Sequence, residues 1–297
     1  MDHALQTPSK PNLSAWLSRS VRVPIKKVLW YLALIGVSIP FVFPFIWMVS
    51  GSLKNQNEIT AFPPTLIPSE FAWNNYVEIF SYQPFAQQYF NSLYIAALVT
   101  LLILVFSSLA GFAFARMKFR GRNIVFVLLL MGLMMPDEVT IIPNFFLMKS
   151  LGLMNTHWPL ILLPVFGSQG IIATFLMRQF FASLPKELEE ASTLDGLTRF
   201  GMYWRIALPL SRPALAAVAI ISFLHSWNLL LEPLVFLSDQ VKFTVPLALT
   251  NFSDAYGLPL WHLQLAATTL SVIPVLLVYI IAQRQIVESF AMSGVKG

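Results

Sequence analysis

The stretch Tyr89–Ala115 reads YFNSLYIAALVTLLILVFSSLAGFAFA and contains no charged residue. A helix rises about 1.5 Å per residue, so this stretch is long enough to cross the roughly 30 Å hydrocarbon layer of a membrane. Five other apolar runs have comparable lengths, and each predicts a further spanning helix. These runs are Val28–Val49, Asn123–Met148, Pro159–Met177, Pro213–Leu231 and Leu263–Gln283. The sequence therefore predicts an all-α polytopic membrane protein with six transmembrane helices.

The overall composition supports this class. The 297 residues are 57% hydrophobic and only 11% charged, whereas a soluble domain has about 25% charged residues. Mean hydropathy is +0.69. The apolar excess excludes a disordered chain, and the absence of cysteine excludes a disulfide scaffold. The net charge of +5 could indicate a nucleic-acid partner, so the positions of the cations decide its meaning.

The lysines and arginines gather on one side of the predicted membrane. If the N-terminus is cytoplasmic, all but three of the 19 fall in inner segments, and the exceptions are Lys54, Lys149 and Lys242. Inner loops of membrane proteins carry such an excess of positive charge. We therefore expect a multi-pass membrane protein with both termini in the cytoplasm and no nucleic-acid partner.

The segments between the runs are short. In residues 1–27, Leu13, Trp16, Leu17 and Val21 recur at helical spacing, which predicts a short helix on the inner membrane surface; a disordered tail is the alternative. Prolines make the segment before the second run an outer loop with at most short helices, and the loop before the sixth run is similar.

We divide the chain into three parts. Residues 1–85 contain the N-terminal segment, the first spanning helix and an outer loop. Residues 86–284 form the transmembrane core, and residues 285–297 form a cytoplasmic tail.

The longest inner loop, residues 182–212, reads ASLPKELEEASTLDGLTRFGMYWRIALPLSR. We expect Ser183 to cap a first short helix and Gly196 to end it in a left-handed turn. Thr198 should then cap a second helix, which stops before Pro209. A compact helix–turn–helix of this kind can transmit a movement of a soluble partner to the membrane helices.

A spaced motif within this loop resembles the EAA loop of binding-protein-dependent ABC importer permeases. Its positions here are Glu190, Ala191, Ser192, Gly196, Ile206, Leu208 and Pro209. Ser192 stands where the family usually has alanine. Other segments resemble the smaller permease subunit of maltose-type carbohydrate importers, so the resemblance covers residues 28–297. These segments read FPFIWMVSGSLK, YFNSLYIA, IIPNFFLMKSLGLMNT, LPLSRPALA, SWN and GVKG.

The resemblance implies a type I ABC importer permease fold, a location in the bacterial inner membrane and a set of partners. It implies a second permease subunit, two cytoplasmic ATPase subunits, an extracytoplasmic solute-binding protein and a sugar substrate. The EAA loop, residues 183–209, would dock on an ATPase subunit. The chain has no Gly-Lys pair and hence no P-loop for nucleotide. We therefore expect a transport subunit, not an enzyme, that binds no cofactor; ATP and Mg²⁺ would lie on the partner ATPase.

Polar residues within the apolar runs are candidates for the solute pathway. An amide and an aromatic ring suit a neutral sugar, which needs a hydrogen-bonding partner and an apolar platform. The candidates are Asp137, Glu138, Asn144, Trp227, Asn228 and Glu232, with Gln264 and Thr268 as weaker ones.

Each candidate has a structural alternative. A helix break at Pro136 would leave Asp137 and Glu138 in outer water. Helical offsets place His225, Asn228 and Glu232 on one face, where His225 and Asn228 could instead bond a neighbouring helix.

No lysine or arginine lies inside the six runs. An anionic solute would need a positive partner in a low-dielectric route, so we expect a neutral oligosaccharide or glycoside. The alternatives are a permease of the same build for a different solute, such as a glycerol phosphate or an opine, and an autonomous secondary carrier.

Overall fold

The computed structural model describes the backbone of residues 25–294 and the side chains through Gln283. The surface helix expected within residues 1–27 lies almost wholly outside these residues, as does most of the closing GVKG segment. The chain divides into two units, of which one ends at Trp47 and the other begins at Met48.

The described part of the first unit is most of α2 (Ile25–Ser52), an apolar helix with Pro40 and Pro44 inside it. The rings of Phe43 and Trp47 lie 6.0 Å apart on this helix. Its length and hydropathy allow it to cross a membrane.

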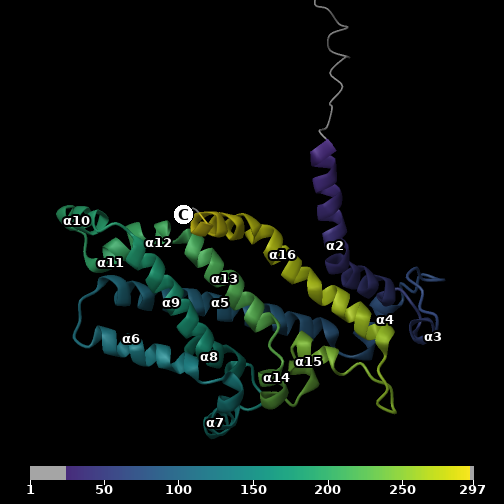
Figure 1. The fold of residues 1–297 in the computed structure, drawn as a ribbon. Helices are drawn as coiled ribbons and strands as arrows, with labels where there is room; N and C mark the ends of the chain where they lie inside the picture. The colour runs from purple at the N-terminus through teal and green to yellow at the C-terminus, as the bar shows by residue number, and fades with distance from the viewer. Residues whose placement is uncertain (1–24, 295–297) are drawn as a thin grey trace, which may run out of the picture. The chain divides into compact units, whose positions relative to one another are not determined.

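The regular elements of the second unit's described residues are all helices, joined by loops, and one isolated β-bridge pairs Ser253 with Pro259 (Figure 1). Its elements are α3 (Gln56–Thr60), α4 (Asn75–Tyr82), α5 (Phe85–Arg116), α6 (Arg122–Met131), η1 (Gly132–Met134), α7 (Asp137–Ser150), α8 (Trp158–Phe166), α9 (Ser168–Ser183), α10 (Glu187–Leu194), α11 (Arg199–Met202), η2 (Tyr203–Ala207), α12 (Leu208–Leu210), α13 (Arg212–Trp227), α14 (Leu231–Phe236), η3 (Gln240–Lys242), α15 (Val245–Leu249) and α16 (Trp261–Gly294).

The long helix α5 forms the centre of this unit, where it packs against α9 and α13. It carries no proline or internal charge, so its backbone bonds are satisfied within the helix. Ile103, Met177 and Val218 are buried where the three helices meet. Gly111 brings α5 so close to α9 that a Cβ there would lie 2.7 Å from that of Met177.

The described residues contain four helices long enough to span a membrane, and six spans if each of two bent pairs counts as one. The third expected span, Asn123–Met148, is not one helix, because α6 and η1 meet α7 at 101°. Proline disfavours a helical conformation in the residue before it, and Met135 before Pro136 is extended. The break at Pro136 is therefore confirmed, and the single continuous helix is wrong.

The fifth expected span, Pro213–Leu231, also ends early. Its helix α13 stops at Trp227, and Asn228 is the C-cap, with its side-chain amide donating to the Leu224 carbonyl at 2.7 Å. Pro233 would clash with the carbonyl four residues earlier if the helix continued. Glu232 consequently belongs to the first turn of α14, so the single helical face expected for His225, Asn228 and Glu232 is wrong.

The expected loops at 50–88 and 238–262 contain only short helices, as predicted. Buried side chains of α5 hold the second of these loops. The Asn91 amide donates to the carbonyls of Val241 (2.9 Å) and Phe243 (3.0 Å), and the Val245 amide donates to Ser92 at 2.7 Å. At the C-terminus, the backbone of α16 remains helical to Gly294, beyond the expected boundary at residue 284.

Candidate functional site

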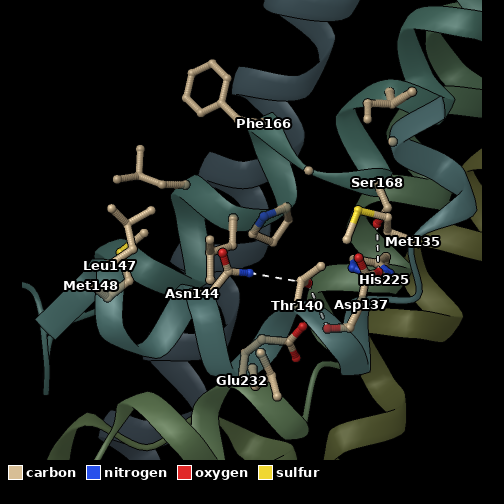
Figure 2. Close-up of a pocket in the computed structure, with 17 residues that line it drawn as sticks. Met135, Asp137, Thr140, Asn144, Leu147, Met148, Phe166, Ser168, His225 and Glu232 are labelled. Atoms are coloured by element: carbon tan, nitrogen blue, oxygen red, sulfur yellow. Dashed lines mark hydrogen bonds between the residues drawn. The ribbon is translucent and has the colours of Figure 1, made fainter. Parts of the chain in front are cut away.

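A pocket of about 390 Å³ lies where α7, the α8–α9 junction, α13 and α14 meet. Figure 2 shows the polar side chains that point into it. The lining residues are Gly132, Met135, Asp137, Thr140, Ile141, Asn144, Leu147, Met148, Leu162, Leu163, Pro164, Phe166, Gly167, Ser168, Ile171, His225 and Glu232.

One face of α7 carries a chain of hydrogen bonds along this pocket. The Asn144 amide donates to the Thr140 hydroxyl at 3.4 Å, and that hydroxyl donates to the Asp137 carbonyl at 2.9 Å. The Ser168 hydroxyl, at the start of α9, donates to the Asp137 carboxylate at 2.7 Å. Spacings of three and four residues place these α7 side chains on one helical face.

His225, from α13, and Glu232, from α14, also line the pocket (Figure 2). The chain turns between α13 and α14, and this turn directs the two half-buried side chains into one cavity. None of the residues that line the pocket in the described part of the chain is a lysine or arginine. The cavity thus offers carboxylates, an amide, hydroxyls and an imidazole, which can all accept hydrogen bonds from a polyhydroxylated solute.

Three predicted pathway residues lie elsewhere. Trp227 is only 3% exposed and packs in a core cluster, with its ring 5.9 Å from that of Phe223 and 5.7 Å from that of Tyr89. Asn228 is exposed at the end of α13, and Glu138 is exposed beside Asp137, but neither lines the pocket.

The weaker candidates Gln264 and Thr268 lie on α16 and also do not line the pocket. The sequence pattern does not single out Thr140 or Ser168, and for His225 it offers a bond to a neighbouring helix as the alternative to a place in the pathway. The Gly167-Ser168 pair interrupts an otherwise apolar run and could have signalled the break between α8 and α9.

The inner loop folds as helix, turn and helix. Gly196 has φ +74°, and the amides of Gly196 and Leu197 donate to the carbonyls of Thr193 (3.1 Å) and Ser192 (2.9 Å). These two bonds form a Schellman motif. Thr198 caps α11 by accepting a bond from the Gly201 amide at 3.1 Å. The predicted turn at Gly196 and the predicted cap at Thr198 are confirmed.

Two local predictions for this loop are wrong. Ser183 ends α9 instead of capping α10, because Leu184 is extended before Pro185, as residues before proline usually are. The second helix also continues through Pro209 to Leu210, and a π turn from Tyr203 to Ala207 precedes this proline. Local irregularity of this kind accommodates a proline within a helix.

The motif residues differ in exposure. Glu190, Ala191, Gly196 and Pro209 are exposed, Ile206 and Leu208 are half-buried, and Ser192 is buried. Beside them lies an exposed apolar patch that sequence reasoning did not single out. It consists of Leu194, Phe200 and Trp204, and its two rings stack at 6.5 Å with 15° between their planes. Exposed aromatic side chains next to a rigid turn are typical of a docking surface.

Apolar spans, an internal polar pocket and a rigid loop at the protein surface together define a membrane transport subunit. The chain belongs to the family described as binding-protein-dependent transport system inner membrane component, whose model matches residues 103–291. This family places the chain among transport subunits of ABC importers, not among enzymes.

Two relatives illustrate the similarity. The arabinooligosaccharides transport system permease protein AraQ of Halalkalibacterium halodurans is 37% identical over 86% of this chain and 91% of its own. The lactose transport system permease protein LacG of Rhizobium radiobacter is 35% identical over 83% and 88%, respectively.

A solved structure supports the fold. One chain of a bacterial ABC transporter that imports the acidic polysaccharide alginate superposes with a TM-score of 0.76 at 22% identity, over 94% of this chain and 99% of that one. The chain therefore has the ABC importer permease fold that the spaced motif implied.

Proposed function

We propose that this chain is the permease subunit of an ATP-driven importer that moves a neutral sugar, such as an oligosaccharide or glycoside, across the inner membrane by alternating access. Two of its relatives bear the names of permeases for arabinooligosaccharides and lactose. Its partners are a second permease subunit, two cytoplasmic ATPase subunits and an extracytoplasmic binding protein. ATP and Mg²⁺ are bound by the ATPase, and both termini of this chain face the cytoplasm.

The inner loop is the observation that carries this proposal. Its spaced motif folds as two short helices joined at Gly196, and the apolar patch of Leu194, Phe200 and Trp204 is exposed beside them. Burial of such a patch against an ATPase subunit would remove apolar surface from water and so drive docking. Glu190, which is exposed on α10, is placed to pair with a cation of that subunit.

The polar pocket supports a neutral solute. Asp137, Asn144 and Glu232 line it without a compensating cation among the described lining residues. A negatively charged solute would be repelled by these carboxylates, whereas sugar hydroxyls can donate hydrogen bonds to their oxygens. A permease of the same build for an anionic solute, with a cation supplied by the second permease, is the competing function, and a secondary carrier is a more distant one.

Purification of the complete complex tests the proposal. The chain is expressed with the permease and ATPase genes beside its own, isolated in detergent and reconstituted in proteoliposomes with the binding protein. We expect the ATPase to co-purify and uptake of a neutral oligosaccharide to require ATP. Uptake by this chain alone, driven by an ion gradient, would instead support the carrier.

A further inference from the structure

One carboxylate of the inner loop contacts cations from two other elements. Glu189 lies in the first turn of α10, and Arg199, the first residue of α11, forms an ion pair with its Oε1 atom. Arg116, the last residue of α5, approaches the Oε2 atom of Glu189 to 3.8 Å. Glu189 therefore links both helices of the loop to the end of the central helix.

The same arginine also holds the end of α9. The Arg116 Nε atom donates to the Phe181 carbonyl at 2.8 Å, and Nη2 donates to the Leu184 carbonyl. The carbonyls at a helix C-terminus have no partners within the helix, so a cation placed there is favourable. The Arg116 side chain is only 7% exposed and that of Glu189 is 24% exposed. A guanidinium group is planar and rigid, so these contacts fix α5, α9 and α10 at one point.

The opposite end of α9 borders the polar pocket. Its first residue, Ser168, donates to the Asp137 carboxylate, and its last turn contains Phe181. The helix has no internal proline. A single rigid helix thus connects the point where Arg116 and Glu189 meet with the polar pocket.

We propose that Glu189 and Arg116 are positioning residues that make the inner loop and the ends of α5 and α9 move as one body. This inference rests on the proposed function, since it requires an ATPase that displaces the loop. It assigns the three glutamates of α10 different roles. Glu190 is available to the partner, Glu189 holds the loop to the membrane helices, and Glu187 is exposed and forms no ion pair with a described residue.

The test compares isosteric variants in the complete complex. Glu189→Gln removes the charge but keeps the shape. Glu187→Gln makes the same change two residues earlier, in the same turn of α10, and is the matched control. We expect Glu189→Gln to retain the ATPase on purification, but to lower solute-stimulated ATP hydrolysis and the solute transported per ATP by about tenfold. Glu187→Gln should behave as the unmodified complex, and Glu189→Asp should recover part of the loss.

A cross-link provides a second measurement that does not depend on charge. The chain has no cysteine, so Arg116→Cys and Glu189→Cys can be combined and joined by a short reducible thiol cross-linker. We expect the double variant to be uncoupled, to regain stimulated hydrolysis when joined, and to lose it again on reduction, whereas neither single variant responds.

Two results would overturn the inference. One is full stimulated hydrolysis by Glu189→Gln, and the other is no recovery when the cross-link forms. If the ATPase fails to co-purify even with the unmodified chain, the proposed function itself fails, so the two failures are distinguishable.

Discussion

The Ser168 hydroxyl donates a 2.7 Å hydrogen bond to the Asp137 carboxylate, and this bond joins two breaks in the membrane helices. Asp137 follows the bend between η1 and α7, while Ser168 follows the junction of α8 and α9. Each break frees backbone groups that a continuous helix would satisfy. Both open toward the same polar pocket, where such irregular backbone can be tolerated.

Asp137→Asn should lower solute uptake by about tenfold or more, because a hydrogen bond to a charged group would be replaced by a neutral one. Glu138→Gln is the matched control, since Glu138 also lies in the first turn of α7 but does not line the pocket. The loss of favourable charge at the helix N-terminus is the same in both variants. Uptake by reconstituted complexes measures the difference. Equal uptake by the two variants would show that Asp137 is not part of the solute pathway.

Trp227→Ala should act on stability, not on solute recognition, because the ring is buried against Phe223 and Tyr89. Removal of a large buried side chain costs ~3 kcal/mol, so the thermal unfolding midpoint in detergent should fall. Trp158→Ala, at a largely exposed tryptophan, serves as the control. An unchanged unfolding midpoint together with weakened uptake would contradict this and support a role for Trp227 in the solute pathway.

Gly196→Trp should abolish the association with the ATPase. The φ of +74° costs a residue with a Cβ about 1 kcal/mol, and the bulky ring would lie on the docking surface. Gly121→Trp is a close control, because Gly121 has φ +80° and equally open surroundings but lies outside the inner loop. Co-purification of the ATPase from membranes separates the two variants; full retention by Gly196→Trp would contradict docking at this turn.

Phe200→Ala combined with Trp204→Ala should weaken ATPase binding by about tenfold or more, since aromatic side chains dominate binding at interfaces. Both side chains are largely exposed, at 65% and 60%, so folding should change little. Binding of detergent-solubilised permease to immobilised ATPase measures the effect. The exposed Tyr256, in another loop, gives the control Tyr256→Ala; binding equal to that control would exclude the aromatic pair from the interface.

A reporter that is active only after export should stay silent when fused after Gly297, because the distribution of lysine and arginine predicts a cytoplasmic C-terminus. The same reporter inserted after Pro64, in the loop that follows α2, should be active. Activity of the C-terminal fusion would overturn the proposed orientation.

Features that depend only on residues close together in the chain could be predicted from the sequence. Uncharged runs such as Tyr89–Ala115 predict spanning helices, because a helix satisfies its own backbone in lipid. Gly196 and Thr198 predict a turn and a cap, because the hydrogen bonds that form them reach only a few residues along the chain. The bend at Pro136 belongs to the same group, since proline restricts the residue before it.

Which side chains meet could not be predicted in this way, because it depends on how helices distant in the sequence pack. Glu232 and Asp137 lie far apart in the sequence, and α13 had to end at Trp227 before Glu232 could enter the pocket. Trp227 is buried because of where α5 packs, which no local pattern encodes. The contact between Arg116 and Glu189 likewise follows from the meeting of three helix ends. Helix periodicity gives the face on which a residue lies, but the packing of separate helices determines which partner that face meets.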